Sequence, residues 1–357
     1  MSLEELCCPA DGTSLHREGK TLVSETGRVY PVVEGVPVLL QEKVPDTLWV
    51  CSASRDAAWA HVRGERDDLH FLDTVGFTPE ERRDAERMAE CDDDGIAAII
   101  NYIVGATNGY LYHHLRGRLS DYPIPRFRLQ GRGRRLLDVG CSWGRWTIAA
   151  ARAGFRPVGI DPSLGVVLAA KRLCERLGIE ADFVVGDARY LPFTAQSFEA
   201  VHSYSVLQHF ARADARRAFG ELGRVLQPGG ESFVQMPNRL GVRCLYHQAR
   251  RGFSDGEEFD VRYWSLSELR ELGEAIGPAS LEVDGFFGLG IQPSDIDYLD
   301  AKGRAVIRLS ESMRRLTNRF PPLIRVADSV YVRSFKPTEA GGRGRDPGTT
   351  LSAPMVA

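Results

Sequence analysis

The segment from 135 to 161 constrains the fold of this chain more than any other part of the sequence. A short, largely apolar run at 135–139 leads into a turn bracketed by Gly140 and Gly144, then into a stretch of helical composition at 146–153. A second apolar run ends at Asp161. Short apolar runs bounded by charge and glycine are typical of parallel strands covered on both faces. The segment therefore predicts part of an open α/β sheet, which binds ligands at the carboxyl ends of its strands.

The glycine spacing distinguishes between two classes of nucleoside cofactor. A dinucleotide site requires G-x-G-x-x-G, so that a helix N-terminus meets the pyrophosphate. This chain instead has Gly140-x-x-x-Gly144, with the bulky Trp143 inside the turn. Asp138 before the turn suits a sulfonium better than a phosphate, and Asp161 is placed to accept hydrogen bonds from both ribose hydroxyls. The charges favour S-adenosylmethionine over NAD.

Two later motifs agree with this interpretation. A strand predicted to end at Gly186 is followed by Asp187, placed to bond the exocyclic amine of an adenine, and by Ala188, which leaves room for the ring. The run 198–210 predicts a fourth strand that continues into an active-site loop. Three further elements are expected after it: a helix at about 212–226, a turn at 227–230 and a fifth strand at 231–236.

Residues from about 134 to 236 resemble class I S-adenosylmethionine-dependent methyltransferases of the small-molecule type. Four motifs stand in the order of that family: Asp-Val-Gly-Cys-x-x-Gly at 138–144, Gly-Asp-Ala-x-x-Leu-Pro-Phe at 186–193, Val-Leu-x-His at 206–209 and Arg-Val-Leu-x-Pro-Gly-Gly at 224–230. The resemblance implies a doubly wound α/β sheet of seven strands in the order 3-2-1-4-5-7-6. Two features depart from the pattern: Glu199 replaces the more usual Asp, and Trp143 and Trp146 enlarge the first turn and helix.

The resemblance also implies the residues that bind S-adenosylmethionine. It implies that the methionine end binds at the first turn and the ribose at the end of the second strand. The adenine is expected to bind at the end of the third strand, and the methyl group to lie at the start of the loop after the fourth. In chain order the residues are Asp138, Gly140, Cys141, Gly144, Asp161, Pro162, Ser163, Gly186, Asp187, Ala188 and Ser203.

Methyl transfer requires little chemistry from side chains, because the cofactor carries the activation. The protein positions the acceptor and excludes water, and a base is needed only where the acceptor keeps its proton. His209 is the candidate base, since it follows the fourth strand and histidine titrates near neutral pH. The alternative is that His209 only shapes the loop. Tyr204, Tyr263 and His247 are weaker candidates, for which packing or surface placement is expected.

The composition excludes several classes of partner. The 357 residues carry a net charge of -3, which argues against nucleic acid. The longest apolar runs, 36–40 and 96–100, are too short for a membrane span, and 1–8 shows no signal-peptide pattern. Seven scattered cysteines fit a reducing compartment. We therefore expect a cytoplasmic protein with a small-molecule acceptor, and its oligomeric state is left open.

The N-terminus resembles the short zinc-ribbon-like module found ahead of some methyltransferase domains. Only Cys8 stands at one of its four ligand positions; the other three carry Asp11, Val23 and Thr26. Tetrahedral zinc requires four suitable ligands, so we expect a metal-free β-hairpin module. The opposing hypothesis is a residual zinc site that uses Cys7, Cys8 and a distant ligand such as His16.

The chain is expected to have four parts. They are a degenerate zinc-ribbon-like module at 1–42, a helical linker or lid at 43–133, a methyltransferase domain at 134–336 and a disordered tail at 337–357. In the lid, Tyr110, Tyr112, His113 and His114 face the substrate or pack on the sheet. Asp92 to Asp94 predict an acidic helix start rather than a metal site.

We expect methyl transfer to an oxygen or carbon atom of a small molecule. A non-catalytic partner or scaffold that binds S-adenosylmethionine is the main alternative, and the degenerate ribbon suggests it. Intact Asp138, Asp161 and Asp187 argue against decay of the cofactor site. The missing third glycine disfavours an NAD-dependent oxidoreductase, and the near-neutral charge disfavours a nucleic-acid methyltransferase.

Overall fold

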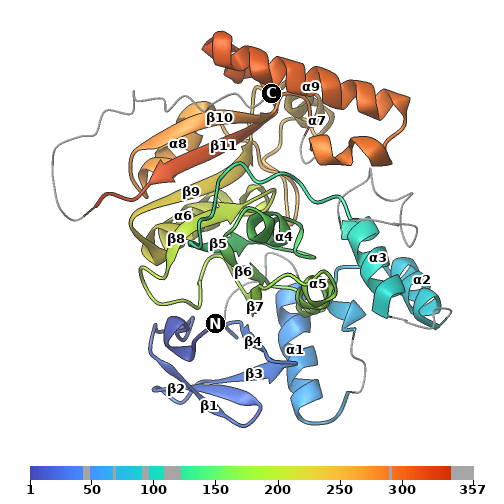
Figure 1. Ribbon diagram of the computed structural model, residues 1–357, viewed down its shortest axis with the longest axis vertical. Coiled ribbons are helices and arrows are strands. Elements are labelled where there is room, and N and C mark those ends of the chain that lie inside the picture. Colours follow the sequence, from blue (N-terminus) through green and yellow to red (C-terminus); the bar gives the residue numbers. More distant parts are fainter. Residues whose placement is uncertain (43–48, 67–69, 91–95, 108–121, 289–291, 339–357) are drawn as a thin grey trace.

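Eleven strands of the computed structural model form one sheet, with the segment 135–161 near its middle (Figure 1). The structure describes residues 1–42, 49–66, 70–90, 96–107, 122–288 and 292–338. The strands lie in the order β1-β2-β3-β4-β7-β6-β5-β8-β9-β11-β10. Counted along the chain from β5, the last seven have the order 3-2-1-4-5-7-6. The sheet is larger than the seven strands expected, because four N-terminal strands extend it.

Five parallel strands form the middle of the sheet, and their order along the chain reverses beside β5. The parallel strands are β5 (Arg135–Val139), β6 (Arg156–Asp161), β7 (Asp182–Gly186), β8 (Phe198–Ser203) and β9 (Leu226–Pro237). Both β6 and β8 pair with β5. Ligands of open α/β sheets bind at such a reversal, outside the carboxyl ends of the strands. We call the ends of β5, β6, β7 and β8 the carboxyl edge.

Helices cover both faces of the middle strands because successive strand residues point to opposite faces. Leu137 packs with residues of α6 and α8, whereas its neighbour Leu136 packs with residues of α4. The helices around the middle strands are α4 (Arg145–Arg152), α5 (Leu164–Arg176), α6 (Arg212–Val225) and α8 (Leu266–Glu274). The α8 start has a capping box, in which the Ser265 side chain accepts the N–H of Glu268.

The two C-terminal strands close one side of the sheet with antiparallel pairing. β11 (Ser329–Phe335) lies between β9 and β10 (Ala279–Gly285). The turn expected at 227–230 is instead part of β9, and the pairing of β8 with β9 shifts register between Phe198 and Ala200. Glycine at 229, with φ of +78°, lets this irregular start of the strand form.

The N-terminal strands make an antiparallel meander that joins the sheet by its last strand (Figure 1). The four are β1 (Leu15–Glu18), β2 (Thr21–Ser24), β3 (Val29–Val33) and β4 (Val36–Leu39). In β4, Val38 pairs with Val185 and Leu39 with Gly186 of β7, in parallel. Every residue of β4 is buried, as in a strand covered on both faces.

The Asp11 carboxylate holds together the N-terminal turn at which the zinc-ribbon-like module found ahead of some methyltransferase domains binds its metal. Asp11 accepts hydrogen bonds from Thr13, from the Thr26 hydroxyl at 2.7 Å and from Arg28 Nε at 3.3 Å. Asp11 and Thr26 occupy two of the four ligand positions. Hydrogen bonds from Thr26 and Thr13 hold the pKa of Asp11 well below its usual range. In the described ranges no group of three or more His, Cys, Asp or Glu side chains is placed to hold a metal ion.

The remaining helices lie before β5 and around the C-terminal strands. They are α1 (Val50–Val62), α2 (Pro79–Glu90), α3 (Ile96–Thr107), α7 (Val242–Arg250) and α9 (Ala301–Arg319). Five short 3-10 helices accompany them among the described residues: η1 (Leu3–Glu5), η2 (Leu72–Thr74), η4 (Leu207–His209), η5 (Pro293–Tyr298) and η6 (Pro321–Val326). None of the helices in the described part of the chain is long and apolar enough to cross a membrane. Tyr110, Tyr112, His113, His114 and Asp92 to Asp94 lie outside the described residues.

Leu22→Ala tests whether the N-terminal strands belong to the main core. Leu22 is 1% exposed and lies in the same hydrophobic cluster as Leu137 and Ile160. Because the truncation leaves a cavity in that shared core, we expect the whole protein to lose about 2–5 kcal/mol of unfolding free energy. Urea unfolding followed by circular dichroism measures it. Leu309→Ala, at an exposed leucine of α9, is the control. An unchanged main transition in Leu22→Ala would show that these strands fold separately.

Candidate cofactor and acceptor site

The glycine turn after β5 lies against the loop after β8. Gly140 has φ of +74°, and a Cβ atom there would lie 2.1 Å from Val206 Cγ2, so a larger residue would clash as well as strain the backbone. The N–H groups of Gly140 and Cys141 donate to the Ile160 carbonyl. Gly144, with φ of +85°, precedes α4. The close contact with Val206 brings the turn and the β8 loop together at the reversal of strand order.

Asp161 ties the glycine turn to the start of α5. Its Oδ2 accepts the N–H of Ser142 at 3.0 Å, and its Oδ1 accepts the N–H of Ser163 at 3.0 Å. Burial raises the pKa of Asp161 to about 6, although the two N–H groups favour the charged form. Each carboxylate oxygen can accept a second hydrogen bond. The side chain therefore retains acceptor capacity for two hydroxyl groups, as ribose recognition requires.

Asp138, which is predicted to lie at the methionine end of the cofactor, is a buried side chain next to the glycine turn. It is 1% exposed, and its Oδ2 accepts the Thr147 hydroxyl at 2.7 Å. Its Oδ1 lies 3.2 Å from His202 Nδ1. His202 was not among the predicted site residues, and its ring is surrounded by Phe127, Trp146, Tyr204 and Tyr331. Asp138 thus anchors α4 to β8 from beneath the turn.

The carboxylate of Asp187, which is predicted to bind the exocyclic amine of adenine, is paired with Arg189 in this structure. Arg189 Nε lies 3.0 Å from both oxygens, and Nη2 lies 2.6 Å from Oδ2. The same arginine contacts Asp214 of α6 at 3.2 Å. The local signal for this pairing is the arginine two residues after the aspartate. Asp187 also lines a small hollow with Pro9 and Cys51, so N-terminal segments border this end of the carboxyl edge.

The other predicted cofactor residues lie at the same edge. The Ser203 hydroxyl donates to the Val139 carbonyl at 3.0 Å and so links β8 to β5. Ser163 caps α5, and its hydroxyl donates to the Thr74 carbonyl of η2. Burial raises the pKa of Cys141 well above its usual value. The rest take up positions next to these residues: Pro162 between Asp161 and Ser163, Gly186 at the end of β7 and the buried Ala188 after Asp187.

His209 is held as a neutral ring in η4. Nδ1 lies 2.6 Å from the Phe259 carbonyl, which only accepts hydrogen bonds, so Nδ1 carries the proton. The ring stacks on Phe259 with centroids 3.8 Å apart. Nε2, which remains as the acceptor, lies 3.3 Å from Gln208 Nε2. Burial lowers the pKa of His209 to about 4. The weaker candidates lie elsewhere: Tyr263 packs on Arg251, and His247 lies on α7.

A buried polar network that the sequence did not reveal lies beside the carboxyl edge. The Tyr204 hydroxyl donates to Asp284 Oδ2 at 2.8 Å and accepts from Gln292 at 2.6 Å. Burial and the nearby Asp284 raise the pKa of Tyr204 well above its usual value. Ser205 has φ of +62°, and its N–H donates to Gln235 at 2.9 Å. These residues lie 30 to 88 positions apart in sequence, so no local motif predicts them.

Residues 136–230 match the family model described as a methyltransferase domain. This chain contains a methyltransferase domain. Over 233 residues it is 27% identical to the ubiquinone biosynthesis O-methyltransferase of Methylocella silvestris, covering 59% of this chain and 88% of that protein. The protein of the same name from Azorhizobium caulinodans is 31% identical over 156 residues, which are 43% of this chain and 57% of that one.

These matches confirm the predicted chemistry: the protein is an enzyme, an S-adenosylmethionine-dependent methyltransferase. Among solved structures, an S-adenosylmethionine-dependent methyltransferase of Methanosarcina mazei is 18% identical, with a TM-score of 0.42. The match covers 59% of this chain and 95% of that one.

Asp138→Ala is expected to act on folding first. It would leave the Thr147 hydroxyl and the His202 ring without their buried partner, and we expect a loss of about 3 kcal/mol of unfolding free energy. Thr147→Val, which removes one hydrogen bond and keeps the volume, should cost about 1 kcal/mol. Urea unfolding of the three proteins without ligand measures both. Equal stability of Asp138→Ala and the unchanged protein would contradict this role.

Proposed function

We propose that this methyltransferase acts on an oxygen atom of a small molecule held at the ends of β8 and β9. The observation that carries the proposal is the contact between the Gly140 turn and Val206, because it joins the loops after β5 and β8 where strand order reverses. A methyl donor in the first loop and an acceptor beside the second would then be neighbours. The two O-methyltransferases matched above support oxygen as the acceptor atom.

We propose that Asp161 binds the ribose and that the turn from Gly140 to Gly144 receives the methionine end. When bound, S-adenosylmethionine supplies a methyl group already activated by its sulfonium sulfur. The side chains then have to bind, orient and exclude water. Asp138 acts through Thr147 and His202 by holding the turn in place. Asp187, paired with Arg189, borders the adenine end together with Ala188.

The proposed domain division gives the N-terminal module a supporting role at the adenine end. We keep 1–42, 43–133, 134–336 and 337–357 as the four parts. β4 pairs with β7, which ends directly before Asp187. Pro9 and Gln41 line the hollow beside Asp187, and the Gln41 side chain donates to the Pro9 carbonyl. Residues 1–42 would thus stabilise the strand that presents the adenine-binding residues.

A reducing, cytoplasmic location and a small-molecule partner complete the proposal. All six cysteines in the described part of the chain are buried and free of disulfides, which supports a reducing compartment. The net charge of -3 supports a small molecule over nucleic acid.

Cofactor affinity is expected to depend on the charge of Asp161. Because the pKa is about 6, the carboxylate gains a proton as the pH falls below 6, and one oxygen then loses acceptor capacity. Calorimetry with S-adenosylhomocysteine between pH 5 and 8 should show affinity falling toward pH 5. Asp161→Asn should bind about tenfold more weakly at pH 7.5, with a flat pH profile.

Asp56→Asn, at an exposed aspartate of α1, is the matched control and should bind as the unchanged protein does. If Asp161→Asn also kept full affinity, the ribose assignment would be wrong.

The base role proposed for His209 is separable from its role in holding the loop. His209→Asn keeps an N–H donor for the Phe259 carbonyl but removes the Nε2 acceptor. If His209 is the base, kcat should fall about 10²–10⁴-fold in both His209→Asn and His209→Ala. Transfer of labelled methyl from S-adenosylmethionine to a panel of phenols and carboxylic acids measures it.

The pH profile gives an independent check. A histidine with a pKa of about 4 is already neutral at pH 6–8, so its protonation should reduce the rate only as the pH falls toward 4. Full activity of His209→Asn with reduced activity of His209→Ala would assign the residue to loop structure alone.

A further inference from the structure

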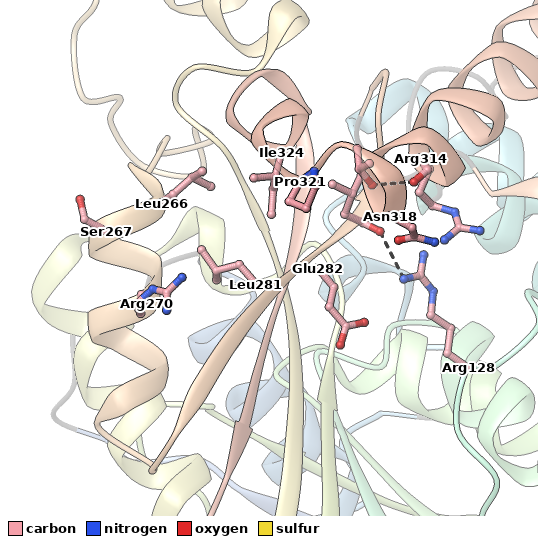
Figure 2. A pocket seen from close by; sticks show the side chains of 12 residues that line it. Arg128, Leu266, Ser267, Arg270, Leu281, Glu282, Arg314, Asn318, Pro321 and Ile324 are labelled. Carbon is pink, nitrogen blue, oxygen red and sulfur yellow. Dashed lines mark hydrogen bonds between the residues drawn. The ribbon is translucent and has the colours of Figure 1, made fainter. Parts of the chain in front are cut away.

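A groove of about 580 Å³ lies beside the C-terminal strand β10, between α8 and the segment of α9 and η6 (Figure 2). Its walls come from α8, β10, α9 and η6, with Arg128 at one side. No residue proposed above to bind S-adenosylmethionine lines it. The groove is therefore a separate site from the carboxyl edge.

The middle of the groove is apolar. Leu266 at the start of α8, Leu281 of β10 and Ile324 of η6 line it, and Pro321 stands beside Ile324 (Figure 2). These side chains are partly buried or exposed, so they keep apolar area in contact with water. An apolar ligand body that covered them would gain roughly 25 cal/mol for each Å² removed from water.

The ends of the groove carry arginines whose charges are not equally compensated. Arg128 donates to Asp284, and Arg314 pairs with Glu311 at 2.6 Å. Glu282, the acidic residue of the lining, lies 3.5 Å from Arg333. Arg270 of α8 is exposed, and within the described ranges it has no hydrogen bond or ion pair. Figure 2 shows it across Leu281 from Arg128 and Arg314. Arg270 is thus an uncompensated cation beside an apolar surface.

We propose that this groove binds a small amphipathic anion, with the acidic group at Arg270 and the apolar body over Leu281. An exposed guanidinium offers paired donors that match a carboxylate or a phosphate. Ser267, one helical turn before Arg270, adds a hydroxyl to the same wall. A carboxylate and a phosphate would both be bound in this way. The site is independent of the methyl-transfer site.

The wall opposite Arg270 connects the groove to the network beside the carboxyl edge. Arg128 donates to the carbonyl groups of Val283 and Asp284 as well as to the Asp284 carboxylate. Asp284 in turn accepts the Tyr204 hydroxyl. Arg128, which lines the groove, is therefore two hydrogen bonds from Tyr204 at the end of β8.

Binding of octanoate, octyl phosphate, octanol and octylammonium to the full-length protein tests the proposal. The titrations are made by calorimetry with saturating S-adenosylhomocysteine, which keeps the cofactor site filled. We expect both anions to bind and the alcohol and the cation to bind at least about tenfold more weakly. A preference between octanoate and octyl phosphate identifies the acidic group.

Two substitutions and a matched control complete the experiment. Arg270→Gln should weaken binding of both anions about tenfold, and Arg270→Glu should make octylammonium the preferred ligand. Arg216→Gln, at an exposed arginine of α6 that likewise has no ion pair or hydrogen bond in the described ranges, should bind as the unchanged protein does. Circular dichroism confirms folding of each variant. Equal affinity for octanoate in Arg270→Gln and Arg216→Gln, or equal affinity for octanoate and octylammonium in the unchanged protein, would overturn the proposal.

Discussion

The carboxylate of Asp161 is the contact on which the geometry of the carboxyl edge depends. One oxygen accepts an N–H from the glycine turn, and the other accepts an N–H from the start of α5. Two main-chain segments that follow different strands are thereby fixed to one side chain. Burial works against this arrangement, because it disfavours the charged form that both N–H groups prefer. The carboxylate is consequently close to the balance between its charged and its protonated form, and a ligand that donates further hydrogen bonds to it stabilises the charged form.

The central sheet was largely predictable from local sequence, and its extension was not. β5, β6, β7 and β8 are short apolar runs with glycine or charge at their ends, so each shows its own signal. The pairing of β4 with β7 joins residues about 150 positions apart, and no local period encodes it. The apolar character of β4 at every position was a sign that both faces are covered. At 227–230 the local sequence predicted a turn, but the segment is part of β9, because pairing with β8 overrode the local turn signal.

Local sequence likewise predicted one part of the candidate site, and only the folded chain reveals the other part. The glycine turn and Asp161 lie within 22 residues of one another, and their spacing predicted that they lie together at the ends of neighbouring strands, where Asp161 accepts the N–H of Ser142. Sequence could place Asp138 and Asp187 at strand ends but could not show what each carboxylate faces. Thr147 and His202 bury the first, and Arg189 pairs with the second. Tyr204, Asp284 and Gln292 come from three separate segments, so only the folded chain brings them together.

The parallel pairing of β4 with β7 has a consequence for how the chain is made. During synthesis from the N-terminus, β4 leaves the ribosome long before the strand it pairs with. At roughly 5–20 residues per second, the delay is about 7–30 s. Throughout that interval an apolar strand has an unpaired edge, which is a surface prone to aggregation. The meander of β1, β2 and β3 is complete before then and covers the opposite edge of β4. The N-terminal strands therefore leave β4 with one open edge rather than two until β7 is made.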